Sequence, residues 1–308
     1  MKYAFLIAAH SDAEQLLRLM KRLLSLGDIY VHIDKKVKDS DYLNKIKAFA
    51  SNVGGQISLV EPRISIAWGG FSQCVGQKVL LENCFNNKSY DRIFFLSGLD
   101  YVLVSDDEFK SFFDANKDKE FVCGFNLTTS NIKSQQARFK YYHYFRDIPL
   151  KHNSILRRMI IVGTRLFLKG LGLRKPLQVP ISQNEKWDIF YGSSWMSMTN
   201  ECAKYVLSQM KDNSVLNKYF STSYTPDELY IPTIVMNSVF RKHAIEINVN
   251  NFNKLTPLHY LNYRGYIYSY DENDYDKIMS SGKIFVRKLV SGKSEKLIEM
   301  INQHCGIS

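Results

Sequence analysis

The clearest candidate for chemistry is a carboxylate in the segment 224–230, which reads YTPDELY. Thr225 is a good helix N-cap, Pro226 suits the first helical position, and Glu228 follows the cap at the spacing of a capping box. A glutamate at that place can simply close the helix end. It can also act as a general base, because the helix dipole favours the ionised carboxylate. The residues alone leave both readings open, and they predict a helix over 226–238.

A second set of polar residues follows apolar runs that are typical of buried strands. In open α/β sheets, ligands bind outside the carboxyl ends of the strands, so strand-end residues are candidates for a binding site. They are His10, Asp34, Trp68, Ser97, Gly98 and Asp100. No GxGxxG follows the first strand and no GxxxxGK[ST] occurs anywhere, so a bound nucleotide would have to be held in another way.

The elements that must position these residues alternate between strand and helix. Apolar runs predict strands at 3–9, 28–34, 56–62, 90–100 and 120–125. Helical spacing predicts helices between the first two strands and near 73–85. Strands that are apolar throughout are typical of a parallel sheet covered on both faces. We therefore predict a Rossmann-like, doubly wound α/β fold with a mainly parallel sheet flanked by helices.

The segment 151–177 is basic, has apolar residues at helical spacing and contains no acidic residue. One interpretation is an ordinary helical insertion with a solvated basic face. The other is a helix that lies on an anionic membrane surface. Aromatic and basic residues also interleave at 138–147, but no RRM, KH or OB signature occurs, so nucleic acid is not a predicted partner.

The composition is that of a globular protein with a basic excess. The chain of 308 residues carries a formal net charge of +11, which favours a phosphorylated or polyanionic partner. Its five cysteines are odd in number and far apart, which fits neither a disulfide framework nor a zinc site. The N-terminal apolar run is read as a strand, and no stretch approaches the roughly 18 apolar residues of a membrane span. These features predict a cytoplasmic protein, peripheral on the inner face of the membrane if 151–177 binds lipid.

Six segments, taken in order, resemble the core-2/I-branching N-acetylglucosaminyltransferase family, which also contains the protein xylosyltransferases. They are VHIDKK (31–36), ISIAWGGFSQC (64–74), YDRIFFLSGLDYVL (90–103), YGSSWMSMTNECAKYV (191–206), YTPDELYIPTIVMNS (224–238) and SGKIFVRKL (281–289). The match covers nearly the whole chain. The resemblance implies a single GT-A-type domain over 1–308, with a nucleotide-binding half at 1–125 and an acceptor-binding and catalytic half at 126–308.

The resemblance also implies roles for individual residues. The family's catalytic base falls on Glu228. Its basic side chains for the donor diphosphate fall on Lys288 and on either Arg264 or Arg287. It places Asp34 and Trp68 on the donor side, where the strand ends add His10, Gly98 and Asp100. Trp195 and Asp227 are the predicted acceptor contacts. Members of the family work without a metal ion, so no metal site or other cofactor is predicted.

The chemistry of the residues agrees with this assignment. An inverting transfer needs one carboxylate to take the acceptor's proton, and without an ion it needs cations at the leaving diphosphate. The strand end SGLDYVL has one Asp and lacks the Asp-x-Asp pair that metal-dependent enzymes use, and DYD at 274–276 reads as helix capping.

We therefore predict a metal-independent inverting glycosyltransferase of surface polysaccharide synthesis. It would move GlcNAc or xylose from a UDP-sugar to a hydroxyl of a glycan acceptor. A glycan attached to a lipid carrier is one form that this acceptor could take. The alternatives are a non-catalytic basic module that binds membrane or nucleic acid, and a metal-dependent glycosyltransferase of another family.

Overall fold

The structure is a computed structural model, and it covers most of the chain. It describes residues 1–86, 88–131, 136–137, 139–151, 154–248, 254–263 and 265–307. Arg264, one of the two candidate diphosphate-binding arginines, lies outside the described residues.

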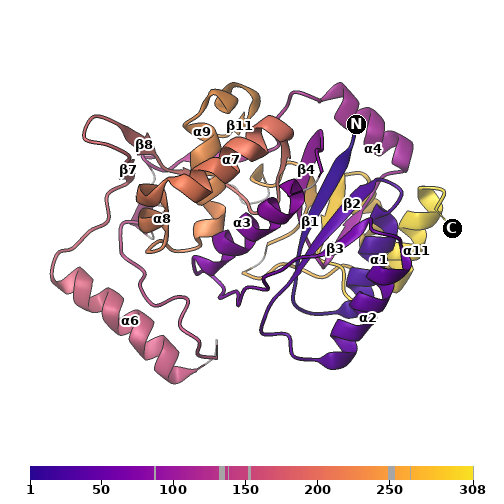
Figure 1. Ribbon diagram of the computed structural model, residues 1–308, viewed down its shortest axis with the longest axis horizontal. Coiled ribbons are helices and arrows are strands. Elements are labelled where there is room, and N and C mark those ends of the chain that lie inside the picture. Colours follow the sequence, from indigo (N-terminus) through magenta and orange to yellow (C-terminus); the bar gives the residue numbers. More distant parts are fainter. Residues whose placement is uncertain are drawn as a thin grey trace.

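Five strands form the central sheet, in the order β10-β4-β1-β2-β3 (Figure 1). They are β1 (Tyr3–Ala9), β2 (Gly27–Ile33), β3 (Ile57–Leu59), β4 (Arg92–Ser97) and β10 (Ser197–Thr199). The first four run parallel, and β10 joins β4 in the antiparallel sense as an edge strand. The chain starts in the middle of the sheet, so the strand order reverses next to β1. That switch point is where open parallel sheets bind their ligands.

Helices cover both faces of this sheet because its strands are apolar on both sides. Tyr3, Phe5 and Ile7 of β1 point to the face packed by α1, α2 and α4, whereas Ala4 and Leu6 point to the face packed by α3 and α7. The bounds are α1 (Ala13–Leu23), α2 (Ser40–Asn52), α3 (Ser72–Phe85), α4 (Asp106–Ala115) and α7 (Asn200–Asp212). The predicted α/β class, with a mainly parallel sheet flanked by helices, is confirmed.

Smaller sheets extend the molecule on either side. Their strands are β5 (Asp100–Val102), β6 (Cys123–Asn126), β7 (Gln178–Pro180), β8 (Lys186–Asp188), β9 (Phe190–Tyr191), β11 (Ile245–Glu246), β12 (His259–Tyr260) and β13 (Phe285–Arg287). They pair as β11-β6-β9, β12-β13-β5 and β7-β8. The run at 120–125 was expected to be a fifth strand of the main sheet. Only Phe121 pairs with the main sheet, through a single bridge to Ser197 of β10, and the rest of the run forms β6 of another sheet.

The remaining helices belong to the second half of the chain. They are α6 (Ile155–Gly170), α8 (Ser214–Phe220), α9 (Tyr230–Met236), α10 (Tyr275–Met279), α11 (Glu295–His304) and the 3-10 turns η1 (Pro226–Glu228), η2 (Val239–His243) and η4 (Glu272–Asp274). The C-terminal segment is tied back to the start of α1, where the Ser291 N–H and hydroxyl donate to the Asp12 carboxylate at 2.8 and 2.6 Å. None of the helices in the described part of the chain is long and apolar enough to cross a membrane.

A buried lysine fixes the segment that follows α6. The Lys175 Nζ atom lies within hydrogen-bonding distance of the Tyr219 carbonyl oxygen and of the hydroxyls of Thr222 and Ser223. Burial lowers the pKa of Lys175 from 10.5 to about 6. Between these two values the unfolded chain binds a proton at Lys175 that the folded chain does not. The contribution of Lys175 to the free energy of unfolding is therefore highest above pH 10.5, where Lys175 is neutral in both states. It decreases as the pH falls toward 6, because protonation of Lys175 then stabilises the unfolded chain.

The variant K175M tests this linkage. We expect the slope of unfolding free energy against pH, measured between pH 7 and pH 9 by urea denaturation, to be smaller than in the wild type by up to about 1.4 kcal/mol per pH unit. K47M, at an exposed lysine of α2, is the matched control and should keep the wild-type slope. An unchanged slope in K175M would show that Lys175 stays protonated in the folded chain.

Candidate active site

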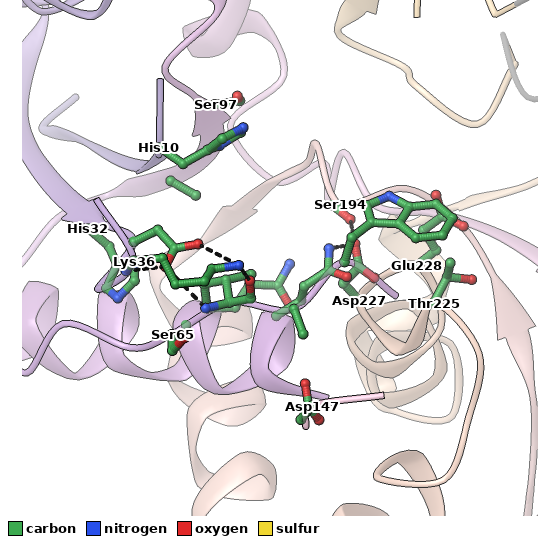
Figure 2. Close-up of a pocket in the computed structure, with 18 of the residues that line it drawn as sticks. His10, His32, Lys36, Ser65, Ser97, Asp147, Ser194, Thr225, Asp227 and Glu228 are labelled. Atoms are coloured by element: carbon green, nitrogen blue, oxygen red, sulfur yellow. Dashed lines mark hydrogen bonds and ion pairs between the residues drawn. The ribbon is translucent and has the colours of Figure 1, made fainter. Parts of the chain in front are cut away.

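A cleft of about 1410 Å³ opens at the carboxyl ends of the central strands. Its walls include His10 after β1, Asp34 after β2 and Ser97 at the end of β4. Figure 2 shows His10, His32, Lys36, Ser65 and Ser97 on one side of the cleft, and Ser194, Thr225, Asp227 and Glu228 on the other. The cleft thus lies where the strand-end rule places it, and it brings segments from both halves of the chain together.

The loop after β2 is held by Asp34. Its carboxylate accepts from the Lys36 N–H at 2.8 Å and lies 3.4 Å from the Lys36 ammonium. The neighbouring His32 accepts from the Ile64 N–H through Nε2 at 2.8 Å, and burial lowers the pKa of its imidazole. This wall therefore presents a carboxylate and an ammonium side by side.

Arg287 is a cation on the cleft wall whose position is fixed by two contacts. The register of β13 against β5 places it opposite Asp100, and Nη1 donates to the Asp100 carboxylate at 2.8 Å. The guanidinium carbon lies 4.7 Å from the ring centre of Trp195, a distance typical of cation–π contact. Arg287 also lines the cleft. The ion pair and the indole together leave the guanidinium little freedom to move.

Asp100 lies behind Arg287 and does not line the cleft. Burial by itself would raise the pKa of the Asp100 carboxyl, but Arg287, His259 and the Ser97 N–H outweigh burial, so its pKa lies below the ordinary value. His259 Nε2 is 3.3 Å from the second carboxylate oxygen. The residues left two roles open for Asp100, binding the donor or capping a turn, and the Ser97 N–H donates to its carboxylate at 2.7 Å, as in a turn cap. The structure places it one layer away, where it can position Arg287.

His10 is exposed at the end of β1 and lines the cleft. Partial desolvation, followed by the positive charge of Arg287, lowers the pKa of its imidazole. His10 therefore favours the neutral form, which can donate or accept one hydrogen bond.

The segment 224–230 does not form the predicted capping box. Thr225 adopts left-handed backbone angles (φ 43°, ψ 57°) and makes no side-chain cap bond. The residues 226–228 form the 3-10 turn η1, and the α-helix begins only at Tyr230. Left-handed angles are strained for a β-branched residue and cost roughly 1–3 kcal/mol, so the surroundings must impose them. The Glu228 side chain lines the cleft.

Three contacts from other elements hold η1 in place. The Gln73 amide and the Ser194 hydroxyl donate to one Asp227 oxygen at 2.9 and 2.5 Å (Figure 2). The Gly192 N–H donates to the Glu228 carbonyl at 2.7 Å. A Cβ at Gly192 would lie 2.2 Å from the carbonyl oxygen of Cys123, so only glycine allows this approach. These contacts explain why tertiary packing overrides the local capping pattern.

Asp227 is a buried carboxyl on the cleft wall. Burial raises its pKa, and the hydrogen bond from Ser194 opposes that rise only in part. Its Oδ1 atom is buried and has no hydrogen-bond partner in the described part of the chain. Asp227 was expected to contact the acceptor. Its position beside Glu228 is compatible with that role, and the role remains a prediction.

Aromatic side chains border the same part of the cleft. Trp68 is 56% exposed and packs edge-on against Tyr224, with ring centres 6.0 Å apart. The Arg146 guanidinium lies 4.5 Å from the centre of the Tyr224 ring. Trp195 stands on the wall next to Arg287. Trp68 is the exposed member of this group, and its ring is suited to stacking against a sugar ring.

Asp147 is a cleft residue that the sequence did not indicate. Its carboxylate accepts from the Phe71 N–H at 2.9 Å and from the Ser72 hydroxyl at 2.6 Å, and so closes the start of α3. A Cβ at Gly70 would lie 2.1 Å from Asp147, which explains the glycine there. Gln73 and Ser194 were missed in the same way, although both lie inside the segments ISIAWGGFSQC and YGSSWMSMTNECAKYV. For Ser194, its place next to the candidate Trp195 was the available signal.

The predicted residues divide into those the cleft brings together and those it does not. The cleft wall contains His10, Asp34, Trp68, Trp195, Asp227, Glu228 and Arg287. Gly98 packs against Ala9 of β1, and Lys288 is half-buried, and neither is part of that wall. Arg287 is thus better placed than Lys288 to meet a ligand. In the described part of the chain, no group of three or more His, Cys, Asp or Glu side chains could hold a metal ion.

An α/β fold with carboxylates and a fixed arginine around one cleft at its strand ends has the make-up of an enzyme that binds an anionic substrate. The family model described as "Branch: Core-2/I-Branching enzyme" matches residues 3–262. The chain belongs to the Core-2/I-Branching enzyme family.

Among curated relatives, xylosyltransferase oxt of Drosophila pseudoobscura pseudoobscura is 23% identical over 77% of this chain and 24% of its own length. Human xylosyltransferase 2 is 22% identical over 98% of this chain and 33% of its own length. The chain spans only about a quarter to a third of the length of these relatives. Among solved structures, the galactosyltransferase LgtC in complex with donor and acceptor sugar analogs is 11% identical, with a TM-score of 0.41 over 99% of this chain and 95% of that one.

Proposed function

We propose that the protein is an inverting glycosyltransferase that uses a UDP-sugar, GlcNAc or xylose being the sugar, and needs no metal ion. The acceptor would be a hydroxyl of a glycan, in the synthesis of a surface polysaccharide in the cytoplasm. Membership of the Core-2/I-Branching enzyme family and the similarity to xylosyltransferases support the reaction class.

The observation that carries the proposal is the joint placement of Glu228 and Arg287 on the wall of one cleft. A carboxylate can accept a proton, and a guanidinium can stabilise a phosphate, so the two groups complement the two ends of a sugar transfer. The cleft volume of about 1410 Å³ exceeds the roughly 300–1,000 Å³ of a pocket for one small molecule. It therefore has room for a donor and an acceptor together.

In the proposed reaction the acceptor oxygen attacks C1 of the donor sugar from the side opposite the diphosphate. Glu228 takes the proton from that oxygen as the new C–O bond forms. The bond between C1 and the diphosphate oxygen breaks, and UDP leaves with the electron pair. Arg287, held by Asp100, stabilises the negative charge that grows on the leaving phosphate. One displacement inverts the anomeric centre.

Asp227 and Trp195 are assigned to the acceptor side. Asp227 lies beside Glu228 on the cleft wall, which supports its place on the acceptor side. Trp195 lies between this side and the guanidinium of Arg287, so it can contact the sugar that is transferred. The donor nucleotide is assigned to Asp34 and His10 at the strand ends.

Thermal unfolding in the presence of a panel of UDP-sugars, with and without EDTA, tests the proposal. A ligand at about 100 times its Kd stabilises the folded chain by about 2.7 kcal/mol and raises the Tm. We expect UDP-GlcNAc or UDP-xylose to raise the Tm, and EDTA to leave that rise unchanged. If no UDP-sugar raises the Tm, the donor assignment is wrong; if EDTA abolishes the rise, the metal-independent part is wrong.

A further inference from the structure

Helix α6 (Ile155–Gly170) projects from the body of the molecule (Figure 1). Its apolar side chains are exposed to solvent. Five of its large apolar side chains are more than half exposed: Ile155 (78%), Leu156 (56%), Met159 (64%), Leu166 (55%) and Phe167 (66%). Leu171 and Leu173, just after the helix, are exposed as well. Single exposed apolar residues are ordinary, but a continuous apolar helix face in solvent marks an interaction surface.

The cations of α6 lie along one edge of this apolar face. Arg158, Arg165 and Lys169 are seven and four residues apart, so at 3.6 residues per turn they share one flank of the helix. Ile155, Met159 and Leu166 share the adjoining flank by the same spacing. No acidic residue occurs between 151 and 177. An apolar stripe bordered by cations complements a surface with an apolar interior and an anionic rim.

The orientation of α6 is fixed by its opposite side. Arg157 and Ile161 are its buried residues, and Arg157 donates to the Arg146 carbonyl at 2.8 Å. Ser154 caps the helix by accepting from the Arg157 N–H. Arg157 also lines the cleft, as does Lys151 just before the helix. The first turn of α6 is therefore at the rim of the cleft, while its apolar face points to solvent.

We propose that α6 docks the protein on the surface of an anionic lipid bilayer. The apolar side chains would enter the boundary between headgroups and acyl chains, and the cations would meet lipid phosphates. A second copy of the chain fits less well, because an antiparallel two-fold contact between α6 faces would bring the cationic flanks together. Docking would also bring the rim of the cleft to the lipid surface. The inference does not rest on the proposed reaction.

Co-sedimentation of the full chain with vesicles tests the docking. We expect binding to phosphatidylcholine vesicles that contain phosphatidylglycerol, weaker binding to phosphatidylcholine alone, and a decrease with added salt. The triple variant R158Q/R165Q/K169Q should lower the partition coefficient on anionic vesicles by roughly 100-fold, as each cation near such a surface contributes on the order of 1 kcal/mol. The variant L166S/F167S should weaken binding to both kinds of vesicle.

Each variant has a matched control elsewhere on the surface. K21Q/K47Q/K110Q removes three exposed lysines of α1, α2 and α4, on the part of the molecule away from α6 (Figure 1), and changes the net charge equally. V239S/M300S removes two exposed apolar side chains outside α6. Both controls should bind as the wild type does.

Three results would overturn the docking proposal. The first is that the wild type does not bind anionic vesicles. The second is that the control variants lose as much vesicle binding as the α6 variants do. The third is that the wild type binds no vesicles but forms a dimer in sedimentation velocity, which the α6 variants dissociate. Binding of a UDP-sugar, followed by thermal unfolding without vesicles, should be the same in all four variants. That readout keeps a failure of docking separate from a failure of the proposed reaction.

Discussion

Replacing Glu228 by Gln is expected to lower kcat for sugar transfer by about 10²–10⁴-fold, the range that general-base catalysis contributes. The amide keeps the shape and hydrogen-bonding capacity of the side chain but cannot take the acceptor's proton. The backbone contacts of Glu228, including the Gly192 N–H to its carbonyl, do not involve the carboxylate, so η1 should persist. Steady-state transfer to a glycan acceptor measures kcat, and calorimetry measures the donor Kd, which should stay at the wild-type value.

The chain offers a matched control for this variant. Glu201 is in the first turn of α7, is exposed and lies outside the cleft wall. E201Q removes the same charge and should transfer at the wild-type rate. Wild-type turnover in E228Q would exclude Glu228 as the base. A loss of donor binding in E228Q would assign the residue to the donor side instead.

The elements that the sequence predicted well are those that depend on local pattern. The first strand was expected at 3–9 and occupies Tyr3–Ala9. A short, continuous apolar run is typical of a strand buried on both faces. The helix expected near 73–85 occupies Ser72–Phe85, and helical spacing of apolar residues was the local pattern that predicted it. The switch from strand to loop at each carboxyl end then places His10 and Asp34 at the cleft.

What the sequence could not predict depends on residues far apart in the chain. Thr225 and Glu228 have capping-box spacing, yet bonds from Gln73 and Ser194 to Asp227 fix a 3-10 turn there instead. The apolar run at 120–125 forms a strand, but pattern alone does not say which sheet it joins, because pairing is non-local. Non-local strand pairing also determines where Asp100 lies.

Asp100 follows an apolar run, so the sequence placed it at a strand end that faces a ligand. The chain turns there and enters β5, whose register against β13 puts Asp100 behind Arg287. The end of β13 separates the adjacent cations: Arg287 is its last residue and lines the cleft, whereas Lys288 follows the strand and does not. The sequence does not state where the strand ends, so it did not distinguish the two residues.

Arg287 is the residue whose loss should have the second large effect. R287A is expected to lower kcat by about 10²–10³-fold, as the loss of one preorganised group at a developing charge does. R287K should have a kcat between those of R287A and the wild type, because an ammonium keeps the charge but lacks the planar fork that suits a phosphate. Removing the guanidinium also leaves the Asp100 carboxylate buried without its ion pair, which costs roughly 3–5 kcal/mol of stability. The kinetic effect must therefore be separated from the loss of fold.

The ion pair between Arg22 and Asp106 makes that separation possible. Arg22 is buried, donates to Asp106 at 2.6 Å and lies outside the cleft wall. R22A and R287A should both lower the Tm, since each leaves a carboxylate without its ion pair. Only R287A should lower kcat once rates are normalised to folded protein, measured by circular dichroism at the assay temperature. An equal fall in both variants would mean that Arg287 acts through stability alone, and the leaving diphosphate would then have to be stabilised by another cation.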